Sequence, residues 1–207
     1  MLPPGSRIDV KTCRDRIELM RFVQTFEDDE GGAGGRSDSL QATGIRWDLG
    51  DLYSSPGDPQ LQEDMNWCAE EAESFAKAYR GRIDVPGGPK AQLIAEVLER
   101  YETLIDKTYK CLSYARLLHS ANSLEAAHGA LLSRVQENAT KVQTSVMFLE
   151  LDWIAVEEKD AKPVISSPLC ARWKHFLGST RRYRPHTLSE KEEIILAEKS
   201  PTGSKAF

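Results

Sequence analysis

The clearest pattern in the sequence is an apolar stripe that follows Asp58. Its residues recur at alternating intervals of four and three: Leu61, Met65, Cys68, Ala72, Phe75 and Tyr79. This spacing places them on one face of an amphipathic helix. Asp58 can cap its first free amides, and Pro59 suits the first helical position. Gly81 can adopt the left-handed conformation that ends a helix.

Two longer stripes follow the turn at residues 84–89. The second stripe predicts one helix and consists of Leu93, Val97, Tyr101, Leu104, Thr108, Cys111, Ala115 and Leu118. After a break near residues 120–122, the third stripe consists of Leu124, His128, Leu131, Val135, Ala139, Val142, Val146, Leu149 and Trp153. A helix unbroken to Val156 would be about 50 Å long at 1.5 Å per residue.

Shorter helices are expected in the last quarter of the sequence. Residues 162–168, Lys-Pro-Val-Ile-Ser-Ser-Pro, should end the third helix region. A helix from Leu169 to Arg182 follows, and Ser189 with Glu192 matches the capping box that opens a final helix. No segment alternates with period two. The predicted fold class is therefore all-α, with long antiparallel helices joined by short turns.

Residues 1–44 differ in character from the rest. Arg7 to Glu27 could form one short helix with scattered apolar positions. The run Glu-Asp-Asp-Glu-Gly-Gly-Ala-Gly-Gly after it is too polar and glycine-rich to offset its ordering entropy. We therefore expect a poorly ordered segment with a flexible linker over 1–44, and a helical unit over 45–207.

Net charge and cysteine spacing limit which partners and which cellular compartment the protein can have. The formal net charge of −5 argues against a general nucleic-acid or anionic-membrane surface. No apolar stretch is long enough to span a membrane, and the N-terminus lacks the apolar run of a secretory signal. The four cysteines lie more than forty residues apart, which fits neither a disulfide framework nor a zinc knuckle. A cytoplasmic protein with reduced thiols is expected.

The sequence contains no complete catalytic constellation. None of the four histidines lies in a His-Glu-x-x-His motif, and no Gly-x-Ser-x-Gly elbow is present. We therefore predict no catalytic residue, no metal ligand and no cofactor in this chain. His128, on the third apolar stripe, is interpreted as a hydrogen-bonded core residue rather than a ligand.

One local concentration of positive charge stands out at residues 181–186, Arg-Arg-Tyr-Arg-Pro-His. These side chains could bind a carboxylate or phosphate. The favoured alternative is that they form salt bridges with the acidic residues of the next helix.

Two stretches resemble a known family. Residues 46–83 combine Trp-Asp-Leu-x-Asp-Leu-Tyr, an Asp-Pro helix start and Phe-x-x-x-Tyr-Arg-Gly. The second stretch has two parts. The first part is residues 148–153, Phe-Leu-Glu-Leu-Asp-Trp. The second part is residues 172–207, which contain Arg-Pro-His-x-Leu-Ser-x-x-Glu-Glu-x-Ile-Leu and Thr-Gly-x-x-Ala-Phe. Both are similar to the N-terminal lobe of oligoendopeptidase F-type zinc metallopeptidases, over about residues 45–207.

The resemblance implies a helical lobe that forms one wall of a peptide channel for short peptides. Zinc and the catalytic residues of such proteins belong to a later part, which would be the partner of this lobe. The chain is thus expected to stop before its catalytic part and to be inactive alone. Tyr183, Arg184 and His186 are weak candidates for contact with peptide. The alternative hypothesis is a free-standing helical interaction or peptide-binding module derived from such a peptidase.

Overall fold

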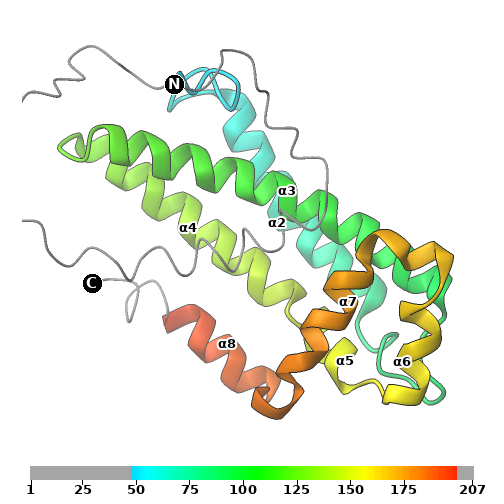
Figure 1. Cartoon of the computed structure of the whole chain (residues 1–207). Coiled ribbons are helices and arrows are strands. Elements are labelled where there is room, and N and C mark those ends of the chain that lie inside the picture. Colours follow the sequence, from blue (N-terminus) through cyan, green and yellow to red (C-terminus); the bar gives the residue numbers. More distant parts are fainter. Residues whose placement is uncertain (1–47, 200–207) are drawn as a thin grey trace, which may run out of the picture.

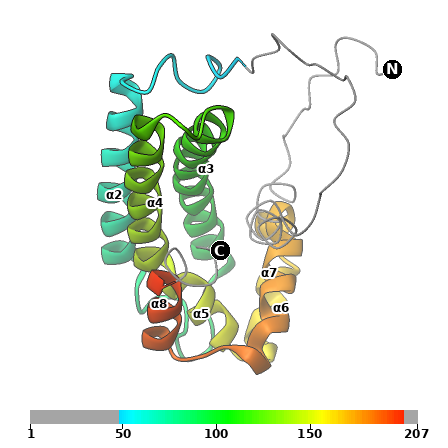
Figure 2. The same ribbon diagram turned by 90° about the vertical axis from the view of Figure 1, so that its left-hand side faces the viewer.

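The structure is a computed structural model that describes residues 48–199, and every regular element in this range is a helix. Three long helices, α2 (Pro59–Tyr79), α3 (Ala91–Ala121) and α4 (Ala126–Val146), lie side by side (Figures 1 and 2). The predicted all-α fold is confirmed. The helix predicted over residues 7–27 and the boundary predicted at residue 44 lie outside the described residues.

Helix α2 follows its sequence signals closely. All six residues of the predicted stripe are buried. The Asp58 carboxylate accepts a hydrogen bond from the amide of Gln60 at 2.9 Å, and Pro59 occupies the first helical position. Gly81 has a φ of 75°, the left-handed conformation expected just after the helix. Local sequence alone therefore determines both ends of this helix.

Helix α3 runs antiparallel to α2 after a turn built on two glycines. Gly87 and Gly88 have φ values of 82° and 74°. A Cβ atom on Gly88 would lie 2.5 Å from Cβ of Asp160, so this turn also requires glycine for its close approach to that residue. Leu93 and Leu118, the two ends of the predicted stripe, are half-buried, and the six residues between them are buried.

The third predicted helix does not run unbroken to Val156, because the structure interrupts it. Helix α4 ends at Val146, and α5 (Phe148–Ala155) begins after Met147. Leu124 lies before α4 in the α3–α4 turn and is 96% exposed, so its assignment to the apolar stripe was wrong. The interruption allows consecutive residues Phe148 and Leu149 both to enter the core.

The segment after α5 contains more helix breaks than predicted. Helix α6 (Glu158–Ile165) continues through Pro163, where the sequence suggested an end. The single helix expected from Leu169 to Arg182 is instead three consecutive pieces: the 3-10 helix η2 (Pro168–Trp173), α7 (Lys174–Thr180) and the 3-10 helix η3 (Arg181–His186). The last helix, α8 (Glu190–Lys199), begins after Ser189 as predicted.

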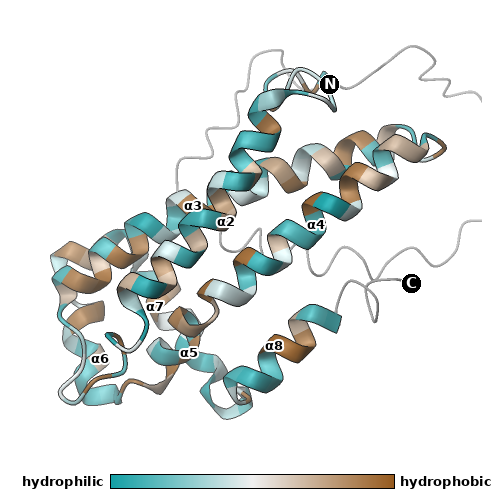
Figure 3. Cartoon of the chain, turned by 180° about the vertical axis from the view of Figure 1, so that it is seen from behind, coloured by the Kyte–Doolittle hydropathy of each residue, from teal (hydrophilic) through white to brown (hydrophobic). Residues whose placement is uncertain are grey.

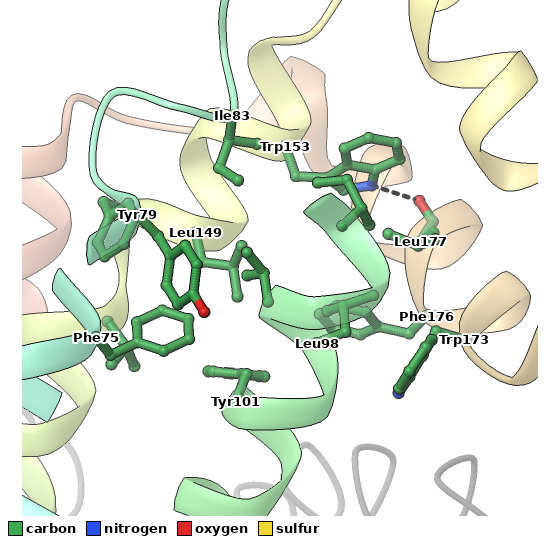
Figure 4. Packing of buried hydrophobic residues seen from close by; sticks show 14 of the residues in the cluster. Phe75, Tyr79, Ile83, Leu98, Tyr101, Leu149, Trp153, Trp173, Phe176 and Leu177 are labelled. Atoms are coloured by element: carbon green, nitrogen blue, oxygen red, sulfur yellow. Dashed lines mark hydrogen bonds between the residues drawn. The ribbon is translucent and has the colours of Figure 1, made fainter. Parts of the chain in front are cut away.

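The buried apolar residues form two clusters. The larger joins α2 and α3 to the shorter helices, and Figure 4 shows part of it. Here Phe75 lies 4.9 Å from Tyr79 and 5.9 Å from Phe148, between ring centroids. The indole N–H of buried Trp153 donates to the carbonyl of Leu177 at 2.9 Å, which ties α5 to α7. The smaller cluster lies between the first half of α2, the second half of α3 and α4.

Candidate functional site

The three residues proposed from sequence as peptide contacts lie on the exposed 3-10 helix η3. Tyr183, Arg184 and His186 are all exposed. Residues three apart eclipse one another in a 3-10 helix, so Tyr183 shares an edge with His186, whereas Arg184 shares an edge with Arg181. The structure therefore groups Tyr183 with His186 and turns Arg184 toward α5, where its guanidinium donates to the carbonyl of Ala155 at 3.4 Å.

Arg181 is the structural centre of this basic segment. Its guanidinium donates to the carbonyls of Trp153 and Val156, each at 2.7 Å, and pairs with Glu158 at 3.1 Å. Its side chain is only 8% exposed, and its guanidinium carbon lies 5.5 Å from the ring centroid of Trp153. A cation at the C-terminal end of α5 also complements the negative end of the helix dipole.

The predicted salt bridges between the basic segment and the following helix are wrong for Arg181. This side chain pairs with Glu158 of α6, which precedes it in the sequence. In α8, Glu190 pairs instead with Arg80 at 2.5 Å, and Glu192 accepts from the amide and hydroxyl of Ser189 at 2.9 and 2.6 Å. The acidic residues that begin α8 therefore cap the helix and join it to the end of α2.

Among the described residues, helix α8 contacts the rest of the molecule through one face. Its half-buried residues are spaced as one helical face: Glu190, Glu193, Ile194 and Ala197. The helix contacts α4 and buries no residue completely. Ile195 and Leu196 are each 55% exposed, and Figure 3 shows apolar positions in the middle of α8. Ile195 and Leu196 therefore form the apolar part of the outer face of α8.

A buried polar network joins the segment before α2 to the bundle. The Asp64 carboxylate accepts from the Tyr53 hydroxyl at 2.9 Å, from Gln60 at 3.0 Å and from the Lys107 ammonium at 2.8 Å. The Tyr53 hydroxyl also lies 3.2 Å from Sγ of Cys111. Sequence analysis missed this network, although Asp64, three residues after Leu61 and on the buried face of α2, was a usable signal.

The pKa values in this network follow from burial and hydrogen bonding. Burial is the largest influence on Asp64 and by itself would raise its pKa. The hydrogen bonds from Lys107, Tyr53 and Gln60 together outweigh burial, so the pKa is lowered from its ordinary 3.8. Burial, assisted by hydrogen bonds with Cys111 and Asp64, raises the pKa of Tyr53. The network thus stabilises an ionised carboxylate beside a neutral phenol, and its position identifies it as structural.

Replacing Asp64 with asparagine should make stability less sensitive to acid. The lowered pKa means that ionised Asp64 stabilises the fold above about pH 4 and that this contribution is lost as the pH falls further. At pH 7 we expect Asp64→Asn to lose about 2 kcal/mol of unfolding free energy, below the usual value for a broken buried pair, because Lys107 is 34% exposed.

Urea unfolding of both proteins between pH 7 and 3 measures this difference. The gap in unfolding free energy should narrow below about pH 4. Asp51→Asn, at an exposed position in the same segment, is the matched control and should leave stability nearly unchanged. A gap for Asp64→Asn that stays constant over this pH range would contradict the ionised state assigned to Asp64.

The histidines and cysteines do not form a metal site in the described part of the chain. His128 is half-buried near the α3–α4 turn, where Nδ1 lies 3.2 Å from the carbonyl of Asn122. It is hydrogen-bonded as predicted, but it is not a core residue. Cys68, Cys111 and Cys170 are buried free thiols. Within residues 48–199, no three His, Cys, Asp or Glu side chains are placed to hold a metal ion.

Across residues 48–199, no helix combines the length and the apolar character that crossing a bilayer requires.

Comparisons with known proteins point to one family. The family model described as Oligopeptidase F matches residues 152–207. Oligopeptidase PepF of Bacillus subtilis (strain 168) is 21% identical over 155 residues, which cover 74% of this chain and 22% of that relative. The chain therefore spans about a fifth of the length of the curated relative it matches. No solved structure matches the chain.

Proposed function

Because the chain carries an oligoendopeptidase F-like N-terminal segment, we propose that it forms the helical N-terminal lobe of a zinc-dependent oligoendopeptidase. In this role the lobe packs against a catalytic part and forms one wall of the channel that admits short peptides. The lobe supplies shape and contacts to peptide, and the catalytic part supplies the hydrolysis. Alone, the chain would not cleave peptides.

The observation that carries the proposal is the outer face of α8. Ile195 and Leu196 lie on the face of α8 opposite the one that, among residues 48–199, contacts the bundle. This helix lies within residues 152–207, the part that matches the Oligopeptidase F family model. Burying two large aliphatic side chains stabilises an interface by roughly 1.5 to 3 kcal/mol each. We therefore assign the contact with the catalytic part to this face.

The described residues do not fit a catalytic zinc. No group of three potential ligands is placed to hold a metal within residues 48–199, and the sequence contains no His-Glu-x-x-His. Zinc and water activation are therefore assigned to the proposed partner, the catalytic part. The contribution of this chain to catalysis would be indirect, through the shape of the channel.

A free-standing interaction module is the competing function. Such a module would need a polar outer face on its last helix, because nothing would then cover that surface. The exposed Ile195 and Leu196 argue against it. In a docked lobe, the catalytic part would cover both side chains, which explains why they are apolar.

Complementation tests the proposal. The full 207-residue chain is mixed with an oligopeptidase F-type catalytic part that lacks its own matching N-terminal segment, in the presence of zinc. Complex formation is followed by size-exclusion chromatography, and hydrolysis by a fluorogenic oligopeptide. We expect a complex and cleavage only after mixing. Changing Ile195 and Leu196 together to glutamine should weaken the complex about tenfold or more, because apolar anchors dominate interface energies.

The matched control is Leu124→Gln, which alters an equally apolar and almost fully exposed side chain in the α3–α4 turn. It should leave the complex unchanged. Cleavage by the 207-residue chain alone, or the absence of any complex, would overturn the assignment of a docked, inactive lobe.

A further inference from the structure

Trp173 carries a buried hydrogen-bond donor that the described part of the chain leaves unpaired. The side chain is 4% exposed, and within residues 48–199 its Nε1 has no hydrogen-bond partner. In the same core cluster, by contrast, the buried indole of Trp153 donates to the carbonyl of Leu177 at 2.9 Å. Buried donors are normally paired, because an unpaired one keeps the full cost of losing its water. The fold therefore leaves this donor available to an acceptor from elsewhere.

The 3-10 helix η2 places Trp173 directly beneath an exposed edge. Residues three apart eclipse one another in such a helix, so Cys170 and Trp173 share its buried edge. Leu169 and Arg172 share the exposed edge, and the Arg172 guanidinium carbon lies 4.5 Å from the ring centroid of Trp173. Figure 4 shows the nitrogen of Trp173 at the end of the ring that is directed away from Phe176. The donor thus points out of the apolar cluster.

Arg172 covers this ring through a contact that a ligand can displace. Its side chain is 54% exposed and pairs with Glu102 of α3. An ion pair with a solvent-exposed partner contributes little to stability, and exposed side chains change rotamer within nanoseconds. Movement of Arg172 away from the ring would therefore uncover the Trp173 donor without unfolding η2.

The neighbouring charges favour an uncharged acceptor for this donor. The Glu102 side chain is 14% exposed and already neutralises Arg172. A carboxylate or phosphate brought to Trp173 would meet the negative charge of Glu102. Leu169, on the same turn of η2, is 52% exposed and offers an apolar contact. A short peptide supplies both matching groups, because uncharged backbone carbonyls alternate with side chains along it.

We propose that the exposed edge of η2 binds a short peptide. A backbone carbonyl of the peptide accepts the hydrogen bond of Trp173, and an apolar side chain of the peptide packs on Leu169. Because the Trp173 donor has already lost its water in the free chain, the new hydrogen bond is gained without a further desolvation cost on the donor side. That the ligand is a peptide rests on the proposed function, whereas the unpaired donor does not.

Nuclear magnetic resonance of the full chain with isotope-labelled tryptophan tests the proposal. The chain contains four tryptophans, and Trp173→Phe and Trp153→Phe identify the indole N–H signals of the two buried ones. A capped, uncharged hexapeptide of alternating alanine and leucine is the probe. Its addition should move the Trp173 proton signal downfield, as expected when an N–H group gains an acceptor, and should leave the Trp153 signal in place. Sodium acetate, the carboxylate probe, should move neither signal.

Two matched pairs of variants separate binding from stability. Leu169→Gln should weaken peptide binding in this titration by about fivefold, because the peptide loses an apolar contact. Leu124→Gln makes the same change at an exposed leucine of the α3–α4 turn and should leave binding unchanged. Trp173→Phe and Trp153→Phe remove the same ring volume, but only Trp153→Phe breaks a hydrogen bond. The melting temperature should therefore fall further in Trp153→Phe.

Several results would overturn the peptide site. They are a Trp173 signal that the hexapeptide does not move, one that acetate moves further than the hexapeptide, and equal weakening by Leu169→Gln and Leu124→Gln. An unmoved signal in a chain that still restores cleavage with the catalytic part would overturn the peptide site alone. A peptide-dependent shift in a chain that forms no complex with the catalytic part would instead overturn the docked lobe and leave the site in place.

Discussion

Replacing Arg181 with alanine is expected to lower the free energy of unfolding by about 3 kcal/mol, as for a buried, multiply bonded charge. The change removes the two hydrogen bonds to the carbonyls of Trp153 and Val156 and the ion pair with Glu158. It also leaves the last carbonyls of α5 without their donor. For a chain of this size the melting temperature should fall by about 9 °C.

Arg182→Ala provides the matched control one residue further along. Arg182 is exposed and has no ion pair within residues 48–199, so its removal should change stability by less than about 0.5 kcal/mol. Arg181→Lys should recover only part of the loss, because an ammonium cannot reproduce the fork of guanidinium donors. Thermal unfolding followed by circular dichroism measures all three. Similar melting temperatures for Arg181→Ala and Arg182→Ala would show that the contacts of Arg181 do not support the fold.

The contrast between these neighbours shows where sequence reasoning stops. Both arginines belong to the same basic run, and their sequence surroundings are nearly identical. Their roles differ because η3 turns one of them toward the end of α5 and the other toward solvent. That orientation depends on how α5, α6 and η3 meet in space, and no local pattern contains it. The favoured prediction therefore paired the segment with the wrong helix.

Features that depend on a few consecutive residues were predicted well. Asp58, Pro59 and Gly81 gave the ends of α2, and Ser189 with Glu192 gave the start of α8. By contrast, Asp64 and Lys107 are 43 positions apart, and their contact follows from the alignment of α2 with α3. The candidate site was accessible only in part: its basic run was visible in sequence, but the burial of Arg181 against the end of α5 was not.

Replacing Leu104 with alanine should produce the largest loss of stability among the variants considered. Leu104 is fully buried in the larger core cluster. Truncating it removes buried apolar surface and leaves a cavity that dense surroundings can fill only partly. Such substitutions lower the free energy of unfolding by about 4 kcal/mol. Urea unfolding at neutral pH, with the slope checked for constancy, measures the effect.

Leu124→Ala is the control that separates the effect of burial from that of the chemical change itself. The chemical change is identical, and periodicity placed both leucines on apolar stripes. Leu124, however, is 96% exposed in the turn between α3 and α4, so its truncation should change stability by less than about 0.5 kcal/mol. A comparable loss for the two variants would mean that Leu124 packs against another part of the protein in solution. A large difference would show that burial decides how much an apolar residue contributes to the free energy of unfolding. Burial in turn depends on where each helix ends.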